Sequence, residues 1–463
     1  MSALLARLRS IQTSESGVSL IEVIVAMMIF AIISVGVAYS LLSAFTITGD
    51  SRSRAVASNL AAQEIDLDRS SGDLFSLLST PVDKQVQVPA GTGLVYSIKR
   101  TASWVYADGA DVNCNASAAS SILYKRIRVE VSWPRMIGQP VTSDTVIAPS
   151  TKVSVDTLGT ILVSVRSAAG TPVAGVGVSV SPDPGSVPTA TDAMGCSYVL
   201  KVPPGTYTVT VSKTGYVDPL QNTSPSTTVT VEAGKSTSAG FTYDSAGKVQ
   251  WSWPTSGGVI APSTASVSFL STYGVWNTAA TSPTSANVFP STEYDVVAGK
   301  YVPYTDTTNS GCRSPNPGDW PQYTSAGKTY LAPAAASVTV APGAVSTPVN
   351  IGALQMGKIT VTNPSNQSAK LYVRAVSAAP FVSGDPGCTA KPQTIDFATQ
   401  LGASANSKMT IALPYGAWTL KYGTSSPPAT AVPSSWLSVP TGATGVTINS
   451  SGAFTLDPRV VQP

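Results

Sequence analysis

The chain has 463 residues, 11% of them charged, and a formal net charge of +3. It is too long for one typical domain, so three or four folded units are expected, and a nearly neutral chain offers no basic surface for nucleic acid. The sequence contains no histidine, which removes the commonest general base and metal ligand and disfavours enzymes built on either.

The first predicted elements are a polar leader, residues 1–17, and an apolar helix over residues 18–45. A run of about 20 apolar residues is enough to cross a membrane. Arg7 and Arg9 precede the helix, so the positive-inside rule predicts a cytoplasmic N-terminus with the rest of the chain outside. An ordinary secretory signal is cleaved after its apolar region. Here the expected cleavage point lies before the apolar region, so the helix is expected to stay with the mature protein.

The junction Gly17-Val18-Ser19-Leu20-Ile21-Glu22 resembles the class III signal of type IV pilins and type II secretion pseudopilins. The resemblance implies that a prepilin peptidase cleaves after Gly17 and that Val18 becomes an N-methylated terminus, although many pilins have phenylalanine there. It also implies that Glu22 serves assembly with other pilin subunits, pairing with the α-amino group of a neighbouring Val18. An acid inside a membrane is functional by default. The alternative is that Glu22 reaches the lipid head groups from the helix end.

The helix is predicted to continue to about residue 70, because Leu60, Ile65 and Leu67 form an imperfect apolar stripe among charged residues. Strands are expected at Gly93–Tyr106 and Ile122–Trp133, whose alternation is typical of half-buried antiparallel strands. They belong to an antiparallel sheet expected over residues 86–150. The predicted N-terminal unit, residues 18–150, is an α+β pilin-like unit: a long hydrophobic α-helix plus a small antiparallel sheet.

Three tandem repeats follow, with boundaries expected at residues 157–243, 244–352 and 353–459. Each begins with a glycine and a short strand: Gly159–Val163, Gly247–Trp251 and Gly357–Val361. Each later has a glycine turn leading into an aromatic strand: Gly205–Val209, Gly299–Val302 and Gly416–Leu420. The repeats are expected to close on paired short strands, such as Thr228–Val231 with Ala239–Tyr243, or Ser337–Val340 with Val349–Ile351. A period of about one hundred residues favours mostly-β tandem Ig-like or transthyretin-like sandwiches over a solenoid.

Within the first repeat, the turns Thr191–Gly195 and Pro203–Tyr207, running on to Lys213–Tyr216, resemble the carboxypeptidase regulatory-like and Cna-B-like sandwiches. Asp and Gly suit a tight turn, Pro-Pro-Gly forces the next one, and Tyr207 and Val209 alternate onto one face of a sheet. The domain of that family is structural, so the resemblance implies no peptidase activity.

The four cysteines have no Cys-x-x-Cys spacing, so a zinc site is not expected. In an exported body they could form disulfides. The favoured pairing is Cys312 with Cys388, both in loops of neighbouring repeats, and Cys114 with Cys196, which would join the pilin-like unit to the first repeat. Four independent, mostly buried thiols are the alternative.

Three further groups of residues are candidate sites. An oxygen-rich loop could hold calcium, but it lacks EF-hand spacing and a solvated loop is favoured, so no metal and no cofactor is expected. Lysines on first strands could form an internal isopeptide bond of the kind some Cna-B-like domains carry, although ordinary surface lysines are favoured. Most distal tryptophans are expected in sandwich cores, with Trp320 the best candidate for an exposed ring that stacks on a sugar or a partner. The loop residues are Asp108, Asp111, Asn113 and Asn115, and the isopeptide candidates are Lys248 or Lys358 with Asn350 and the acid Glu293.

The sequence therefore predicts no enzyme but a minor pilin-like subunit in a sparse or tip position of a type IV pilus, displaying β-sandwich repeats for adhesion to a surface, a glycan or a cell. The expected precursor is a single-pass protein of the cytoplasmic (inner) membrane, and the mature protein belongs to a cell-surface pilus or pseudopilus. Two alternatives stay open: a pseudopilin of a type II secretion or DNA-uptake machine, and a membrane-anchored binding protein that never polymerises.

Overall fold

The computed structural model describes residues 19–461, except 71–73, 75–76, 78, 80–82, 92, 119–121, 149–154, 280–283, 301–315, 344–346 and 388–391. The chain divides into two compact units, each with its own core. Unit 1 contains residues 1–105, 109–111 and 123–151, and unit 2 contains residues 106–108, 112–122 and 152–463. A stretch between two strands of unit 1 thus belongs to unit 2.

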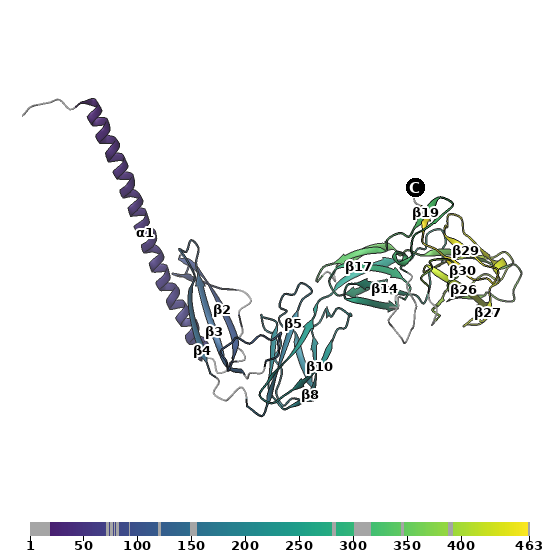
Figure 1. Cartoon of the computed structure of the whole chain (residues 1–463), viewed down its shortest axis with the longest axis horizontal. Helices are drawn as coiled ribbons and strands as arrows, with labels where there is room; N and C mark the ends of the chain where they lie inside the picture. Colours follow the sequence, from purple (N-terminus) through teal and green to yellow (C-terminus); the bar gives the residue numbers. More distant parts are fainter. Residues whose placement is uncertain are drawn as a thin grey trace, which may run out of the picture. The chain divides into compact units, whose positions relative to one another are not determined.

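Unit 1 begins with one long helix, α1 (Leu20–Ser70), which is drawn in purple in Figure 1. The predicted continuation of the apolar helix to about residue 70 is confirmed, and the Ser-Ser-Gly sequence that follows Arg69 coincides with its end. Only its second half has buried side chains, namely Ala57, Ala61, Ile65 and Asp68. Their spacing of three or four residues places them on one face, which packs on the sheet of unit 1.

The sheet of unit 1 has four strands in the order β1-β2-β3-β4. The strands are β1 (Lys84–Val88), β2 (Leu94–Tyr106), β3 (Ile122–Ser132) and β4 (Val141–Ile147). Alternate residues of β3 are buried, among them Ile127, Val129 and Val131, so one face of the strand points to the core. A long helix against an antiparallel sheet is the arrangement that the sequence predicts.

Unit 2 contains three sandwiches of two sheets each, in which the predicted first strand is always the middle strand of a three-stranded sheet. These sheets have the orders β11-β5-β7, β16-β13-β21 and β25-β22-β28. The facing sheets have the orders β10-β8-β6, β15-β14-β17-β20 and β24-β23-β26-β30-β29. Side chains from both sheets of each pair form one hydrophobic cluster per sandwich, so the mostly-β class predicted for this part of the chain is confirmed.

The strands of the three sandwiches have the following bounds. The first has β5 (Gly159–Arg166), β6 (Gly177–Ser181), β7 (Cys196–Val202), β8 (Gly205–Ser212), β9 (Tyr216–Val217), β10 (Ser226–Val231) and β11 (Ser236–Thr242). The second has β12 (Asp244–Ser245), β13 (Gly247–Ser252), β14 (Ser266–Ser271), β15 (Gly274–Ala279), β16 (Ser285–Val288), β17 (Ser291–Ala298), β20 (Ala336–Val340) and β21 (Val349–Ala353). The third has β22 (Gly357–Thr362), β23 (Tyr372–Ser377), β24 (Thr394–Asp396), β25 (Lys408–Leu413), β26 (Gly416–Gly423), β27 (Thr430–Ala431), β28 (Leu437–Ser438), β29 (Val446–Ile448) and β30 (Phe454–Leu456).

Two short 3₁₀ helices, the two-stranded sheet β12-β9 and a small extra sheet complete the described part of unit 2. The helices are η1 (Pro317–Asp319) and η2 (Ser434–Trp436). The extra sheet has the order β18-β19-β31 and joins the hairpin β18 (Tyr323–Ser325) and β19 (Lys328–Leu331) to the C-terminal strand β31 (Val460–Val461). The end of the chain is therefore paired with a hairpin that lies far from it in sequence.

The expectation that each repeat closes on two strands paired with each other is wrong. In the first sandwich β10 pairs with β8, whereas β11 pairs in parallel with β5 in the facing sheet. In the second sandwich β20 pairs with β17 and β21 with β13, again in different sheets. The reason is burial: Val229 and Val231 of β10 and Ala239 and Phe241 of β11 point into the same core, so these strands face each other across it.

The expected aromatic strand Gly299–Val302 lies partly outside the described residues. Gly299 and Lys300 follow β17, and residues 301–302 lie outside the described part of the chain. The strand equivalent to β8 and β26 is β17 itself, with Tyr294 as its buried aromatic residue. Phe289 and Pro290 make the preceding turn, so the sequence offers no glycine there to mark it.

Candidate functional site

The N-terminal half of α1 is an apolar surface without cover. Every residue from Leu20 to Gly49 is exposed, and an 18-residue window of the helix has a mean hydropathy of 2.7. At 1.5 Å per residue this half extends over about 45 Å, more than the roughly 30 Å thickness of a bilayer core. The helix is long and apolar enough to cross a membrane, and none of that window is buried within the chain.

The sheet of unit 1 begins to cover α1 at Asp50. One oxygen of its carboxylate accepts a hydrogen bond from the backbone N–H of Ile137 at 3.1 Å, and the other accepts one from Arg54 Nε at 2.9 Å. The Arg54 guanidinium also donates to the Ile137 carbonyl and lies 5.7 Å from the centre of the Trp133 ring. Charged and aromatic groups thus mark where the helix meets its own sheet, and the apolar half projects beyond that point.

Glu22 lies in the first turn of α1, where the backbone carbonyl of Ser19 accepts from the N–H groups of Glu22 and Val23. Its side chain is exposed, and within the described residues it makes no hydrogen bond or ion pair. A carboxylate at the start of an apolar helix favours a cationic partner. The predicted processing residues Gly17 and Val18 lie outside the described residues.

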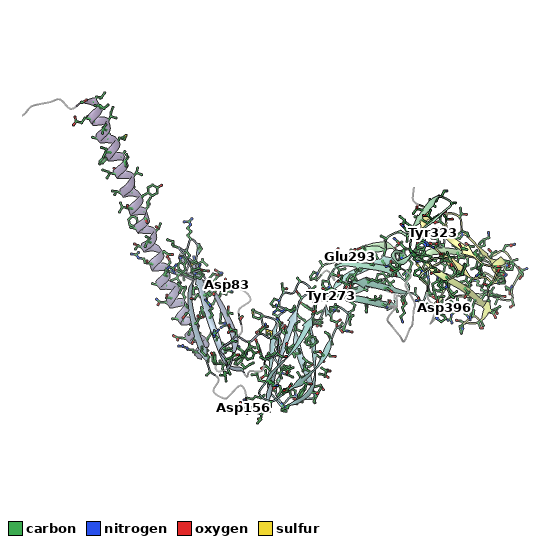
Figure 2. All side chains as sticks on the ribbon, viewed as in Figure 1. Asp83, Asp156, Tyr273, Glu293, Tyr323 and Asp396 are labelled. Carbon is green, nitrogen blue, oxygen red and sulfur yellow. A yellow bond between two sulfur atoms is a disulfide. The ribbon has the colours of Figure 1, made fainter. Side chains whose placement is uncertain are left out.

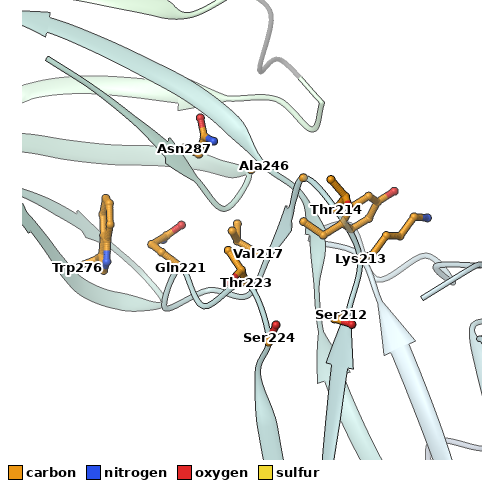
Figure 3. A pocket seen from close by; sticks show the side chains of 12 residues that line it. Ser212, Lys213, Thr214, Val217, Gln221, Thr223, Ser224, Ala246, Trp276 and Asn287 are labelled. Atoms are coloured by element: carbon orange, nitrogen blue, oxygen red, sulfur yellow. The ribbon is translucent and has the colours of Figure 1, made fainter. Parts of the chain in front are cut away.

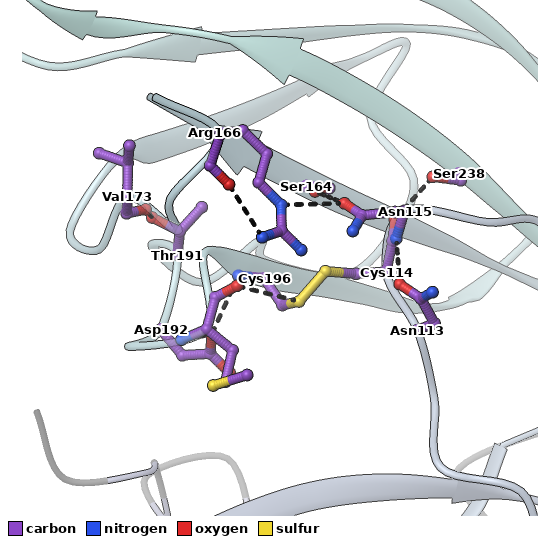
Figure 4. The surroundings of a disulfide bond; sticks show 12 residues. Asn113, Cys114, Asn115, Ser164, Arg166, Val173, Thr191, Asp192, Cys196 and Ser238 are labelled. Atoms are coloured by element: carbon purple, nitrogen blue, oxygen red, sulfur yellow. Dashed lines mark hydrogen bonds between the residues drawn. A yellow bond between two sulfur atoms is a disulfide. The ribbon is translucent and has the colours of Figure 1, made fainter. Parts of the chain in front are cut away.

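The structure joins Cys114 to Cys196 by a disulfide, with the two Cα atoms 5.8 Å apart (Figure 4). Both residues belong to unit 2, Cys114 in the stretch that follows β2 and Cys196 at the start of β7. Cys312 and Cys388, the other proposed pair, lie outside the described residues. Disulfides persist in oxidising compartments, so this bridge is consistent with export of the part of the chain that follows α1.

The stretch around Cys114 covers the open edge of β11. Ala118 forms a β-bridge with Ser236, and the Ser238 hydroxyl donates to the Cys114 carbonyl at 2.6 Å. The amide oxygen of Asn115 accepts from the Ser164 hydroxyl and, at 3.5 Å, from Arg166 Nε (Figure 4). These contacts provide partners for backbone groups that an edge strand would otherwise expose.

In the oxygen-rich loop that could hold calcium, the described side chains have protein partners of their own. Asp111 is paired with Arg126 at 3.0 Å and accepts from the Ser103 hydroxyl at 3.1 Å. Asn113 accepts from the backbone N–H of Asn115 at 3.0 Å. Asp108 also has interactions of its own. No cluster of three or more Cys, Asp or Glu side chains suited to a metal occurs among the described residues.

The isopeptide candidates are also separated. Lys248 on β13 pairs across the sheet with Asn287 of β16, and Asn350 on the opposite strand, β21, accepts from the backbone N–H of Gly352 at 2.9 Å. Glu293, labelled in Figure 2, lies on β17 in the facing sheet. It accepts from the Ser337 hydroxyl at 3.1 Å. Lys358, half-buried on β22, is paired across the sheet with Ala412. The acid that the reaction needs is therefore not placed beside Lys248 and Asn350.

The expectation that Trp320 is exposed is wrong, because only 4% of this residue is accessible to solvent. The Arg459 guanidinium lies 5.0 Å from the centre of the Trp320 ring and 4.3 Å from that of Tyr323. Arg459 is held in turn by the Asp457 carboxylate at 2.7 Å and by the Pro321 carbonyl at 3.0 Å. The proline- and glycine-rich sequence around Trp320 predicts an exposed loop. In the structure, the C-terminal segment around Arg459 covers this loop.

Asp385 lies beside this cluster with one carboxylate oxygen accepting from the Gly387 N–H at 2.9 Å and the other buried without a hydrogen-bond partner. Burial raises the pKa of Asp385 to about 6, against the opposing effects of the Gly387 hydrogen bond and of Arg459. No sequence pattern marks this residue, since its surroundings come from segments far apart in the chain.

The structure also reveals a cavity of about 560 Å³ between the first and second sandwiches. Of its lining residues, the sequence draws attention to Lys213–Tyr216 only as a turn and to Trp276 only as one of several aromatic residues. Gln221, in the wall of the cavity, has no sequence signal, because its role depends on a backbone φ of 67° and on contacts with the second sandwich.

Two family models match the sequence. The prokaryotic N-terminal methylation motif matches residues 13–38, which include Gly17, Val18 and Glu22. The carboxypeptidase regulatory-like domain matches residues 160–250, the first sandwich. The chain therefore carries a type IV pilin signal and a carboxypeptidase regulatory-like domain, as both resemblances predict. Such a signal implies processing by a prepilin peptidase and pilus-like assembly.

Comparisons with whole proteins are much weaker. No curated protein matches the sequence. Among solved structures, the Bacillus anthracis TIE protein is 11% identical, with 82% of this chain and 72% of that chain covered and a TM-score of 0.19. A streptococcal ancillary pilin is 9% identical, with coverages of 74% and 73% and a TM-score of 0.15. BcpA, the major pilin subunit of Bacillus cereus, is 11% identical, with coverages of 65% and 94% and a TM-score of 0.16. At these scores we draw no functional conclusion from them.

Proposed function

We propose that this chain, which begins with a type IV pilin signal, is a minor pilin-like subunit that a prepilin peptidase cleaves after Gly17 and that assembles through α1. The precursor spans the cytoplasmic membrane once, with its N-terminus in the cytoplasm. After cleavage, α1 packs among the helices of other subunits, and the three sandwiches are displayed at the cell surface. The role is structural and adhesive, without catalysis.

One observation carries this proposal: the uncovered apolar half of α1 begins with a carboxylate that has no intrachain partner among the described residues. An apolar helix of this size needs a membrane or other helices to cover it. Cleavage after Gly17 would create an α-amino group at Val18, and the Glu22 carboxylate of a neighbouring subunit could pair with it. The matched methylation motif spans both groups.

Two features of unit 2 support export and display. The Cys114–Cys196 disulfide favours an oxidising compartment outside the cytoplasm. Three sandwiches add far more mass than a filament shaft needs, which favours a sparse or tip position. The sandwiches lie far along the chain from the assembly helix. Adhesion is the function that best fits modules in this position.

The test replaces Glu22 with alanine in cells that contain the complete machinery. Glu22→Ala should leave cleavage after Gly17 intact, as read by N-terminal sequencing, and should reduce incorporation into sheared filaments at least tenfold. Asp66→Ala is the matched control, because Asp66 is also an exposed acid on α1 but lies in the half that reaches the sheet. Its incorporation should stay normal.

Three other outcomes would redirect the proposal. Normal incorporation of the Glu22→Ala chain would remove the assembly role of this acid. An uncleaved N-terminus beginning at Met1 or Ser2 would indicate a membrane-anchored binding protein that does not polymerise. Retention of the wild-type chain in a short envelope-spanning structure, instead of a surface filament, would indicate a pseudopilin.

A further inference from the structure

The cavity has walls from the first and second sandwiches, which contact each other directly. Val217, Ala246 and Phe289 are all at most 5% exposed and form a small hydrophobic cluster across the junction. Gln221 adds a polar connection, since its Oε1 accepts from the Phe289 N–H at 2.5 Å and its Nε2 donates to Tyr294 Oη at 3.4 Å. A cavity with braced walls is formed before any ligand arrives, which lowers the entropic cost of binding.

Aromatic rings provide the apolar part of the lining. Trp276, on the edge strand β15, is half-buried and rests on Phe269, with 5.5 Å between ring centres. Tyr216, on the side of the first sandwich, is also half-buried and packs on Tyr243 at 5.6 Å. Figure 3 shows Trp276 and Lys213 at opposite ends of the group of lining residues. Both rings are thus held from behind and leave part of their surface open.

Most of the polar part of the lining is uncharged. Within the part of the chain that the structure describes, no protein hydrogen bond engages the side chains of Thr214, Thr223, Ser224 or Asn287, and all four are exposed. Lys213 is the one charged lining residue. Its ammonium already donates to the Ala174 carbonyl at 2.8 Å and lies 4.4 Å from the centre of the Tyr216 ring.

We propose that this cavity binds a neutral carbohydrate, with the Trp276 ring stacked on a sugar face and the free hydroxyl and amide groups bonded to sugar hydroxyls. Sugars combine apolar C–H faces with many hydroxyls, which matches aromatic surface beside uncharged hydrogen-bonding groups. None of the described residues that line the cavity is acidic, and its one described cation, Lys213, already donates to the Ala174 carbonyl, so most of the lining's hydrogen-bonding groups suit a neutral ligand. The volume of about 560 Å³ lies within the roughly 300–1,000 Å³ typical of small-ligand sites. The inference rests on the proposed display function and gives it a ligand class.

The experiment uses the full chain in detergent, titrated calorimetrically with maltotriose, cellotriose and chitotriose, and with sialyllactose as the charged counterpart. At least one neutral trisaccharide should bind. Trp276→Ala should weaken that binding at least tenfold, and Thr223→Val and Asn287→Ala roughly 3- to 10-fold each, the effect of losing one hydrogen bond. Phe381→Ala, which removes an exposed aromatic ring in the third sandwich, and Asn350→Ala, on the other edge of the same sheet as Asn287, should bind normally.

Thr223→Val keeps the inference testable if Trp276→Ala disturbs the fold, because Thr223 is exposed and valine has nearly the same shape. Binding of none of the neutral sugars, binding of sialyllactose alone, or equal affinity in the wild-type and Thr223→Val chains would overturn the inference. The Glu22→Ala chain separates it from the proposed assembly role. Sugar binding by a chain that never assembles would leave the cavity inference standing alone, and assembly without sugar binding would leave only the pilin-like role.

Discussion

Asp385 illustrates how a residue acquires its chemistry from distant segments. Its carboxyl group is buried near Asp457 and Arg459, and burial raises its pKa from the ordinary 3.8 to about 6. In the unfolded chain the same group keeps the ordinary value. The folded state therefore binds the proton more tightly than the unfolded state, and stability increases as the pH falls through 6 toward 3.8.

We predict that the third sandwich is more stable at pH 5 than at pH 8 and that Asp385→Asn removes this difference. The change from 3.8 to about 6 corresponds to about 3 kcal/mol at full deprotonation, so Asp385→Asn should stabilise this sandwich by about 1–3 kcal/mol at pH 8. Urea unfolding at both pH values measures it. Asp183→Asn is the control, because Asp183 accepts the equivalent hydrogen bond from Gly185 at 2.8 Å but is exposed. Equal pH dependence in both variants would contradict the assignment.

Gln221 is the second residue whose effect can be measured directly. Its left-handed backbone costs roughly 1–2 kcal/mol in a residue with a side chain, and that side chain satisfies the buried Phe289 N–H. Gln221→Ala should destabilise the junction of the first two sandwiches by about 1–3 kcal/mol through the unsatisfied N–H. Gln221→Gly should cost about 1 kcal/mol less, since glycine adopts this conformation freely.

Hydrogen exchange at the Phe289 amide, together with urea unfolding, measures both effects of the Gln221 variants. Exchange should accelerate in both variants, because each removes the acceptor. Equal stability of the alanine and glycine variants would show that the positive φ carries no cost here.

At the scale of elements, strand β11 depends on a segment that is remote in sequence. Cys114 and Cys196 are 82 residues apart, and their bridge holds the 114–118 segment against the edge of β11. We predict that the double variant Cys114→Ser with Cys196→Ser loses about 2–5 kcal/mol of stability in the first sandwich. Amide exchange should rise along β11 first, and exchange in β22 of the third sandwich serves as the internal control. Unchanged protection of β11 would mean that hydrogen bonds alone hold the segment.

Elements governed by local pattern were predictable from the sequence. The apolar run and the stripe after it placed α1 to within a few residues, and the glycines that begin β5, β13 and β22 marked the central strands. Which strands pair with each other was not predictable from the sequence. The sequence around β10 and β11 predicts two short strands, but only the shared core places them in opposite sheets.

The candidate sites follow the same division. Glu22 stood out because an acid in an apolar helix is rare. The prediction that Trp320 is exposed is wrong because Arg459 packs against its ring. Arg459 donates a hydrogen bond to the Pro321 carbonyl but lies 138 residues away from Pro321 in sequence. The sequence does not predict the cavity lining or the role of Gln221 for the same reason, because the residues around them come from two different sandwiches.

For the whole molecule, the proposed role predicts a low copy number in filaments. A subunit whose sandwiches occupy most of its 463 residues should be present in sheared filaments in far fewer copies than the main pilin. Quantitative mass spectrometry of peptides from α1 and from the third sandwich measures the ratio, and filaments from the Glu22→Ala strain give the background. Copy numbers equal to those of the main pilin would exclude a sparse position.

The disulfide has a mechanical consequence. Cys114 lies in the stretch between β2 and β3, whose ends continue into unit 1, while Cys196 begins β7 of the first sandwich. The sandwiches are thus linked to the N-terminal unit both by the backbone after β4 and by a covalent bridge into the β2–β3 connection. A pull on the C-terminal modules therefore has two covalent routes into the unit that carries α1. A reducing environment would leave only the noncovalent contacts of the 114–118 segment to share that load with the backbone.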